Sequence, residues 1–455
     1  MKALYERYHI AVKEAPAKIK LPPKYLVKRY NNCTNAQECT QACIYGVHEA
    51  KEDGKIADPN EELCRGCYMC VLKCPKAAIS IGVNPEFEKL GNSYFSPDRI
   101  KTIYFEAETG RVPVSGAGYT GPFAGLGFDG IWFDFSEIVR PTRDGIHGRE
   151  YISTSVDLGR KLQSLKFDEN GKLVSNVPKT VEIPIPMILD APLKCGTSRN
   201  LQLVVARAAA RLKTFAIVNA REYSSDLARY KASLIPRINH DQIDEFEDLV
   251  KKSQIVELES RGSDVEEELK KVRAINPSAL VSCRFIYDSE APERADKLAR
   301  LGGDIVHFHV DDADVERDPD SIKNAILSVN TYLVDRHNRD KITLIFSGGI
   351  AEAAHVPKSI ILGANAVAVG LAYQIALGCN VCHGNMHGQG CPISLEDGDV
   401  ELATQRIMNL IGAWRDQLLE VLGGMGLREV RRQAGETGRA MFYEDLEARI
   451  FGDKE

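Results

Sequence analysis

Residues 342–372 read ITLIFSGGIAEAAHVPKSIILGANAVAVGLA, and this stretch decides the fold. It holds two short apolar runs, ITLIFSG and AVAVG, with a helical pattern between them. Both runs are apolar throughout rather than alternating with polar residues, which is typical of parallel strands that helices cover on both faces. The stretch therefore predicts two parallel strands joined by a helix.

Six similar runs precede this stretch, and helical, charge-patterned segments separate them. In chain order they read IPIPMILDA (183–191), TFAIVNA (214–220), ASLIPRI (232–238), QIVELES (254–260), ALVSCRF (279–285) and DIVHFHV (304–310). Eight strand-and-helix units in about 200 residues predict an α/β fold, the (β/α)8 TIM barrel. An open doubly wound sheet is the structural alternative.

In such a barrel the chemistry lies at the carboxyl ends of the strands. Ser347, Gly348 and Gly349 stand at the end of the seventh run, and Gly370 and Leu371 at the end of the eighth. Glycines at these ends leave backbone N–H groups open to a phosphate, at the usual phosphate site of this barrel. We expect the phosphate of a flavin there; the alternative for each glycine pair is a plain loop.

Composition limits the classes of protein to consider. The chain has 455 residues, 44% of them hydrophobic and 27% charged, which suits a globular protein of two or three domains. Its net charge of −6 gives no reason to expect nucleic acid or a membrane as partner. The opening MKALYERYHIAVKEAPAKIK lacks an apolar stretch of signal-peptide length, and no run of 18 apolar residues occurs. We expect a cytoplasmic protein.

Ten of the twelve cysteines fall in three clusters, and a cytoplasmic chain uses clustered cysteines for metal rather than for disulfides. Residues 64–75 read CRGCYMCVLKCP. The spacing C-x2-C-x2-C-x3-C-P brings three thiolates to one iron-sulfur cube and sends the fourth to a second cube. Zinc, which prefers paired C-x2-C units with a longer spacer, is the alternative.

Residues 33–43, CTNAQECTQAC, repeat this motif 31 residues earlier (64 − 33 = 31), but Ala36 stands where the second copy has Cys67. By the crossed pattern, one 4Fe-4S cluster takes Cys43, Cys64, Cys67 and Cys70. The other site takes Cys33, Cys39 and Cys74. We predict that it holds a 3Fe-4S cluster, or a second 4Fe-4S cluster whose odd iron has a non-cysteine ligand. A degenerate site without a cluster is the alternative.

Through these cysteines, residues 25–85 resemble the bacterial-type two-cluster ferredoxins, specifically their seven-iron variants. Residues 347–392, SGGIAEAAHVPKSIILGANAVAVGLAYQIALGCNVCHGNMHGQGCP, and residues 139–154, VRPTRDGIHGREYIST, resemble another family. They are similar to the FMN-binding synthase domain of glutamate synthase, in the archaeal-type form with its own ferredoxin domain. The resemblance covers most of the chain and implies an FMN-dependent iron-sulfur flavoprotein oxidoreductase.

In that family, three cysteines beyond the eighth strand hold a 3Fe-4S cluster next to the FMN. Cys379, Cys382 and Cys391 match them in order, but the spacing C-x2-C-x8-C departs from the family's C-x5-C-x4-C. The resemblance therefore implies a 3Fe-4S or a 4Fe-4S cluster, the latter with Cys195 or His387 as fourth ligand. Zinc is again the alternative.

The resemblance also implies flavin contacts. The loop that would lie against the isoalloxazine comprises Ala191, Pro192, Leu193, Lys194 and Cys195. Strand two ends at Asn219, and strand five carries Arg284 where the family has a lysine that stabilises negative charge on the reduced flavin. The alternatives are a helix N-cap for Asn219, a surface ion pair for Arg284 and a small core residue for Cys195.

The substrate side departs further from the family. Strand four leads into LESRGSDVEEELKK instead of the lysine- and glycine-rich loop that closes on 2-oxoglutarate. His309-Val310-Asp311-Asp312 replaces the Gly-Gly-Thr-Gly loop after strand six. The chain begins Met1-Lys2, without the N-terminal catalytic cysteine of a glutaminase domain, so we expect any glutaminase-like activity on a separate subunit.

Two functions follow from this pattern. The first is a ferredoxin-linked, FMN-dependent synthase that reduces an imine formed from a 2-oxo acid and an amine. The alternative is an electron-transfer subunit of a larger redox complex that has lost glutamate synthase activity. Either function needs a redox partner, a ferredoxin or an NAD(P)H-oxidising subunit, and suggests a multi-subunit complex or a homo-oligomer.

The expected domains are an N-terminal extension (1–24), a ferredoxin-like domain (25–85), a connecting part (86–178), the FMN-binding barrel with the third cluster (179–398) and a C-terminal helical region (399–455). Amphipathic spacing from Asp399 to Gly452 predicts helix that packs across the barrel.

Overall fold

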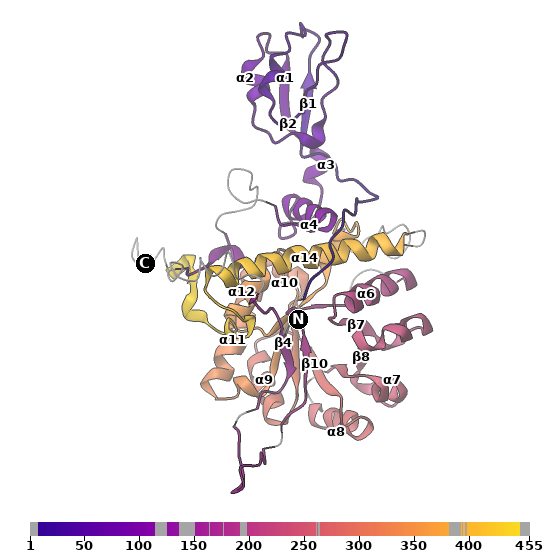
Figure 1. Ribbon diagram of the computed structural model, residues 1–455, viewed down its shortest axis with the longest axis vertical. Coiled ribbons are helices and arrows are strands. Elements are labelled where there is room, and N and C mark those ends of the chain that lie inside the picture. Colours follow the sequence, from indigo (N-terminus) through magenta and orange to yellow (C-terminus); the bar gives the residue numbers. More distant parts are fainter. Residues whose placement is uncertain are drawn as a thin grey trace, which may run out of the picture. The chain divides into compact units, whose positions relative to one another are not determined.

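Figure 1 shows the computed structural model as a ribbon. The structure describes residues 8–113, 125–135, 151–162, 164–175, 177–191, 198–260, 262, 264–381, 393, 395 and 398–445. The chain divides into two compact units, one of Met1–Pro16 with Thr102–Glu455 and one of Ala17–Lys101. The predicted ferredoxin-like boundaries, 25–85, lie inside the second unit.

The larger unit is a closed barrel of eight parallel strands, so the prediction of a TIM barrel is confirmed and the open sheet is excluded. The strands are β6 (Met187–Leu189), β7 (Ala216–Asn219), β8 (Leu234–Asn239), β9 (Ile255–Glu259), β10 (Leu280–Ile286), β11 (Ile305–His309), β12 (Thr343–Ser347) and β13 (Ala366–Val369). Each pairs with the next in sequence, and β13 pairs with β6 to close the barrel. All eight coincide with the apolar runs.

Helices follow the strands around the barrel in Figure 1. They are α6 (Arg199–Arg211), α7 (Glu247–Lys252), α8 (Val265–Ile275), α9 (Ala291–Arg300), α10 (Asp312–Arg317), α11 (Asp320–Asp335), α12 (His355–Leu362) and α13 (Leu371–Ala376). Local sequence sets their limits: the Ser198 hydroxyl caps α6 by accepting from the Leu201 N–H. In α9 the buried Ala291, Ala295 and Leu298 repeat at helical spacing and face the barrel.

The barrel interior is polar near the carboxyl ends of its strands. Arg237 on β8 is 4% exposed and pairs with Asp190 at 2.6 Å and with Glu257 at 2.7 Å. Burial alone would raise the pKa of both carboxyls, but Arg237 together with His307 outweighs it and lowers both, that of Glu257 to about 2. One buried cation therefore joins β8, β9 and the residue that follows β6.

Helix α14 (Val400–Gly424) runs across the barrel in Figure 1 and packs against α6, α12 and α13. Its buried Asn409 donates to the carbonyls of Lys13 and Ala107, and Trp414 donates to Glu106, whose pKa burial raises to about 8. The predicted helix was too long, because the chain leaves it after Gly424 and later forms β14 (Ala440–Phe442), which pairs with β3 (Ile131–Phe133).

The smaller unit is built around an antiparallel pair, β1 (Tyr25–Arg29) and β2 (Ile79–Val83). Two short helices, α1 (Glu38–Ala42) and α2 (Met69–Lys73), occupy equivalent places in the two sequence repeats. Each is preceded by a residue at φ 60°, Gln37 or Tyr68, and 68 − 37 gives the same offset of 31. The sequence repeat is therefore also a backbone repeat.

The remaining elements connect these parts. They are α3 (Pro85–Glu88), α4 (Pro97–Thr109), β4 (Val156–Gly159) and β5 (Thr180–Ile183), the last two paired antiparallel.

Replacement of Arg237 by leucine tests the buried ion pairs. The variant Arg237→Leu leaves two carboxyls in the barrel without their cation, and we expect it to lower the free energy of unfolding by about 3–5 kcal/mol. Denaturant unfolding followed by circular dichroism measures this change. The matched control is Lys270→Ala, which breaks an exposed i,i+4 pair with Glu266 and should cost under about 0.5 kcal/mol. Equal losses in the two variants would contradict the structural role of Arg237.

Candidate functional site

Two glycine-bearing strand ends lie next to each other in the barrel. Gly348 and Gly349, after β12, have φ angles of 86° and 64°, which favour glycine. A Cβ on Gly348 would lie 1.8 Å from the Val310 carbonyl oxygen, so no side chain fits there. Gly370, after the neighbouring β13, precedes the first residue of α13, Leu371. The arrangement suits a phosphate held by backbone N–H groups.

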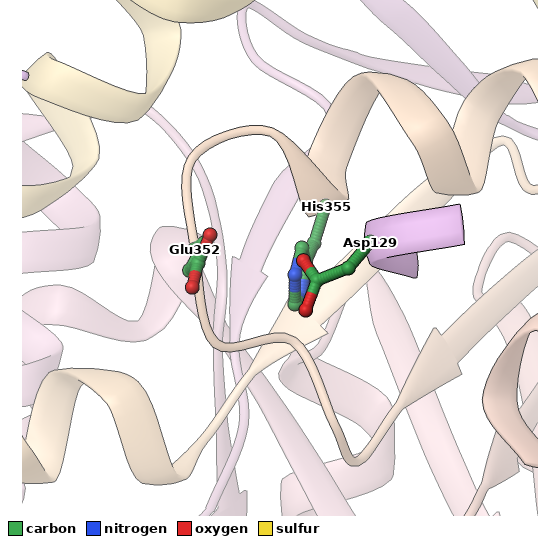
Figure 2. A group of neighbouring side chains, drawn as sticks. All are labelled: Asp129, Glu352 and His355. Carbon is green, nitrogen blue, oxygen red and sulfur yellow. The ribbon is translucent and has the colours of Figure 1, made fainter. Parts of the chain in front are cut away.

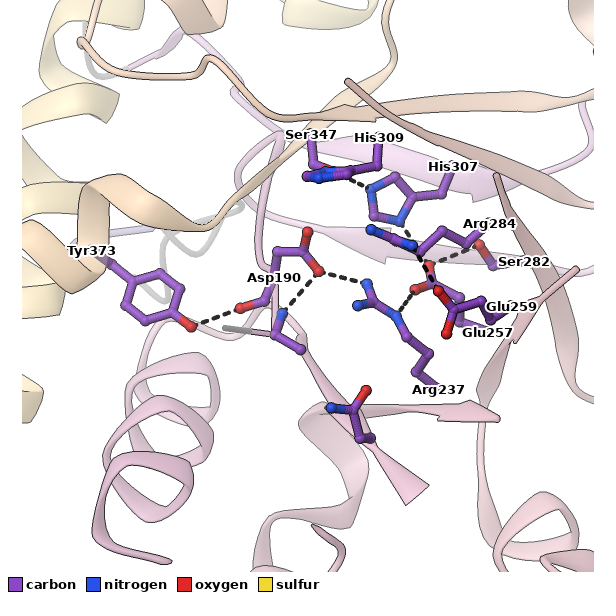
Figure 3. Close-up of polar contacts among 12 residues, drawn as sticks. Asp190, Arg237, Glu257, Glu259, Ser282, Arg284, His307, His309, Ser347 and Tyr373 are labelled. Carbon is purple, nitrogen blue, oxygen red and sulfur yellow. Dashed lines mark hydrogen bonds and ion pairs between the residues drawn. The ribbon is translucent and has the colours of Figure 1, made fainter. Parts of the chain in front are cut away.

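A chain of hydrogen bonds runs through the same end of the barrel (Figure 3). Glu257 Oε2 lies 2.8 Å from His307 Nδ1, and His307 Nε2 lies 2.8 Å from Ser347 Oγ. Ser347 Oγ in turn lies 2.9 Å from His309 Nδ1. These four side chains come from β9, β11 and β12, and each is at least 95% buried. The chain ends at His309, the last residue of β11.

The direction of this chain follows from its charged end. Glu257 is ionised and only accepts, so His307 donates from Nδ1. While His307 is neutral, its Nε2 accepts from the Ser347 hydroxyl, and Ser347 then accepts from His309 Nδ1. Burial and the Arg284 charge lower the pKa of His309 to about 3, so its imidazole is neutral and carries one proton. The lone pair of His309 is therefore at Nε2.

Arg284 lies deep in the barrel and is not the surface ion-pair residue of the alternative reading. It is 2% exposed and pairs with Glu259 at 3.0 Å. Burial and the nearby Arg237 lower its pKa. Its Nε atom is buried and has no hydrogen-bond partner among the described residues. A buried donor of this kind fits an anionic group bound at the carboxyl ends of the strands.

Of the other predicted flavin contacts, only Asn219 and Ala191 lie within the described residues. Asn219 makes no side-chain cap, and its amide donates to Glu222 at 3.3 Å. Ala191 is buried, and its N–H donates to the Asp190 carboxylate. Pro192, Leu193, Lys194 and Cys195 lie outside the described residues.

The third cysteine cluster is described only in part. Cys379 is buried, and its Sγ accepts from the Val381 N–H at 3.5 Å. Cys382, Cys391 and the alternative ligand His387 lie outside the described residues.

In the smaller unit, the two predicted ligand sets line two separate cavities. One cavity is lined by Cys43, Cys64, Cys67 and Cys70, together with His48. The other is lined by Cys33, Cys39 and Cys74, together with Ala36. The fold thus exchanges one cysteine between the two repeats, as the crossed pattern requires; cluster binding itself stays a prediction.

The surroundings of the cysteines suit thiolates held by a cation. The Val47 N–H points to Cys43 Sγ at 3.4 Å, and the Ala78 N–H, 31 residues on, points to Cys74 Sγ at 3.2 Å. Burial and the neighbouring Cys43 and Cys64 raise the pKa of Cys70 to about 11. Without a cation such a group stays protonated, and a metal ion reverses this preference.

Three further side chains could hold a metal ion, which the sequence analysis did not foresee (Figure 2). Ligand atoms of Asp129, Glu352 and His355 lie within 4.8 Å of one another. His355 Nδ1 lies 3.2 Å from both the Ala351 N–H and the Gly349 carbonyl, which ties it to the glycine loop. All three side chains also have other partners, so we assign no metal to this group.

The sequence analysis also missed Arg237, Glu257 and His307. These residues lie inside runs that look apolar. Within the runs, however, polar residues occupy every second position, as in VELE and VHFH. Alternate residues of a strand share one face. This spacing was the available signal for a polar barrel interior.

Comparison with known proteins bears on this arrangement. Residues 319–428 match the model of the conserved region in glutamate synthase. The archaeal-type NADPH glutamate synthase of Thermotoga maritima is 25% identical, and the match covers 96% of this chain and 99% of that protein. The archaeal NADPH enzyme of Methanocaldococcus jannaschii is 26% identical, covering 92% of this chain and 95% of that protein. These findings support a glutamate synthase-like enzyme.

The match to the larger glutamate synthases is local. The large chain of the NADPH enzyme from Azospirillum brasilense is 26% identical, over 36% of this chain and 12% of that protein. None of the described helices of this glutamate synthase-like enzyme is long and apolar enough to cross a membrane.

The tautomer of His309 is a direct test of the hydrogen-bond chain. In protein labelled with 15N-histidine, we expect the His309 ring to be protonated at Nδ1 and unprotonated at Nε2 at neutral pH. The variant Ser347→Ala removes the acceptor of the Nδ1 proton and should shift His309 toward the other tautomer. NMR nitrogen shifts, assigned with His309→Gln, make the measurement. An Nε2-protonated ring in the unaltered protein would contradict the direction inferred here.

The variant Ala36→Cys tests the second cysteine cavity. Ala36 lines this cavity with three cysteines, so the change adds the missing thiolate. We expect the iron content to rise by one atom per chain and the EPR signal of an oxidised three-iron cluster at this site to disappear. Ala36→Ser, which adds a hydroxyl in place of a thiolate, is the control. Unchanged iron and signal would mean that the site has another fourth ligand or no cluster.

Proposed function

We propose that this chain is an iron-sulfur flavoenzyme that uses FMN to reduce an imine formed from a 2-oxo acid and an amine. The observation that carries the proposal is the buried Arg284, whose free Nε lies in a barrel with two glycine strand ends. The full-length similarity to archaeal-type glutamate synthases supports the same reaction class. FMN would supply the hydride, and the iron-sulfur clusters would deliver electrons singly.

The residues of the barrel have separate tasks in this proposal. Gly348, Gly349 and Gly370 would hold the phosphate of FMN through backbone N–H groups. Arg284 would place a cation beside the part of the ring that becomes negative, and its burial strengthens this attraction because little water screens it. Arg237 remains bound to Asp190 and Glu257, so it orients the interior and does not serve as the ligand for FMN.

His309 would handle the proton of the reaction. Its lone pair at Nε2 makes it a base, and a proton taken there is shared along Ser347 toward His307. The charge then comes to rest beside the ionised Glu257, which stabilises it. Because the pKa of His309 is low, its ring does not keep a proton taken at Nε2, which favours passing the charge along this chain.

For the clusters we propose the sets predicted from spacing. A 4Fe-4S cluster would take Cys43, Cys64, Cys67 and Cys70, which line one cavity. A 3Fe-4S cluster, or a 4Fe-4S cluster with a non-cysteine ligand, would take Cys33, Cys39 and Cys74. The third cluster, 3Fe-4S or 4Fe-4S, would take Cys379, Cys382 and Cys391. The compartment we propose is the cytoplasm, with a ferredoxin or an NAD(P)H-oxidising subunit as electron donor.

An electron-transfer subunit is the second candidate, and one observation favours it. Strand β11 ends at His309 and leads through Val310 into the short helix α10. Strand β9 leads toward α8, whose first turn carries Glu266, Glu267 and Glu268. These acidic residues would repel the carboxylates of a 2-oxo diacid. The glycine strand ends expected to bind the cofactor are present, whereas the loops expected to bind the substrate differ from those of glutamate synthase. This pattern suits a changed substrate or a partner protein that accepts the electrons.

FMN content is the first test. We expect the purified protein to release one equivalent of FMN on denaturation, and Gly348→Ala to release almost none, because the new Cβ collides with the Val310 carbonyl. Gly171→Ala is the control, since Gly171 also has positive φ but has nothing within 4 Å of its added Cβ. Release of FAD, or of no flavin, would overturn the proposal.

Turnover separates the two candidate functions. The protein is mixed without oxygen with reduced ferredoxin, ammonia or methylamine, and a set of 2-oxo acids, and amino acid products are measured. A product whose formation falls at least tenfold in His309→Gln, with FMN content unchanged, supports the synthase. No product from protein that contains FMN and iron would favour the electron-transfer subunit.

A further inference from the structure

His48 is a buried polar residue that the proposed function leaves unexplained. It lies in the smaller unit, is 3% exposed, and neither ring nitrogen has a hydrogen-bond partner among the described residues. An imidazole ring carries at least one N–H donor in either of its protonation states. A buried donor without an acceptor is costly, and native proteins rarely keep one. A partner outside the described protein atoms would satisfy this donor.

The position of that partner is given by the cavity. His48 lines the same cavity as Cys43, Cys64, Cys67 and Cys70. Among the described residues that line this cavity, Arg65 is the one permanently charged side chain. Four thiolates already give each iron of a cube one ligand, so the imidazole is not needed as a ligand. Its N–H is therefore available as a hydrogen-bond donor beside the four cysteines.

The sequence repeat provides an internal comparison. The offset of 31 that pairs Cys43 with Cys74 also pairs His48 with Ile79 (79 − 48 = 31). Ile79 lines the other cavity and is 4% exposed. At equivalent buried places, one cavity therefore has an N–H donor and the other has only hydrocarbon. Packing alone explains the isoleucine and does not explain the histidine.

We propose that the His48 N–H donates a hydrogen bond to a sulfur of the cluster held by Cys43, Cys64, Cys67 and Cys70, and so raises the reduction potential of this cluster alone. The inference rests on the iron-sulfur part of the proposed function. A donor to sulfur stabilises the extra negative charge of the reduced cluster more than it stabilises the oxidised one. Reduction adds one electron to the cluster, and any one-electron donor of low potential can supply that electron. The proton of the hydrogen bond stays on His48. In this role His48 tunes the reduction potential of the cluster without binding iron.

The test is a redox titration followed by EPR on the intact protein, after iron and sulfide have been measured in every variant. His48→Ile copies the Ile79 site, and His48→Gln keeps an N–H donor. We expect His48→Ile to change the reduction equilibrium of the four-cysteine cluster about tenfold, a fall of about 59 mV for one electron. His48→Gln should recover at least part of the shift, and the potential of the three-cysteine cluster should not move in either variant.

A second measurement covers the case in which His48→Ile loses its cluster. Pulsed EPR of the unaltered, reduced protein labelled with 15N-histidine should show coupling of the cluster to an imidazole nitrogen, and His48→Gln should lose it. No coupling, or an unchanged potential in His48→Ile with full iron content, overturns the role of His48 and leaves the iron-sulfur assignment standing. Absence of iron from the unaltered protein overturns the proposed function itself.

Discussion

The rest of the barrel depends on one buried cation. Arg237 projects from β8 and holds Asp190, just after β6, and Glu257 on β9. Because it keeps Glu257 ionised, it also fixes His307 as a donor, and through Ser347 it sets the orientation of His309. TIM barrels usually fill this space with branched aliphatic residues. Here charged side chains occupy this space, and Arg237 offsets the cost of burying Asp190 and Glu257 by pairing with both.

The smaller unit is organised by its sequence repeat. A sequence repeat with an offset of 31 produces two short helices, two N–H···S contacts and two cavities, and the crossing of one cysteine ties the repeats together. Two of the differences between the repeats lie at the cavities. Ala36 stands against Cys67, and His48 against Ile79. These differences leave the backbone repeat intact. In the proposed clusters they would change the number of ligands and the polarity around sulfur, and with them the redox properties of the two sites.

Similarity to archaeal-type glutamate synthases extends along nearly the whole chain, although only about a quarter of the residues are identical. The two sides of the barrel mouth differ in their chemistry. The glycine ends of β12 and β13 and the buried Arg284 suit the flavin, whereas β9 and β11 lead into acidic helices. A flavin imposes the same geometric demands on any protein that binds it. A substrate or an electron acceptor is free to change, and the strand ends that face it change with it.

The sequence by itself determined the eight strands of the barrel, because continuous apolar runs and glycine ends are local signals. It also determined the cysteine repeat, because ligand spacing is a property of a short segment. It overestimated the last helix, where Gly423 and Gly424 end α14 although apolar spacing continues. Only the tertiary structure decided that β13 closes on β6, that Arg237 meets carboxyls from two other strands, and that His48 faces four cysteines. Those partners lie tens of residues apart, and a period-two pattern tells which face a side chain occupies without telling what it will meet there.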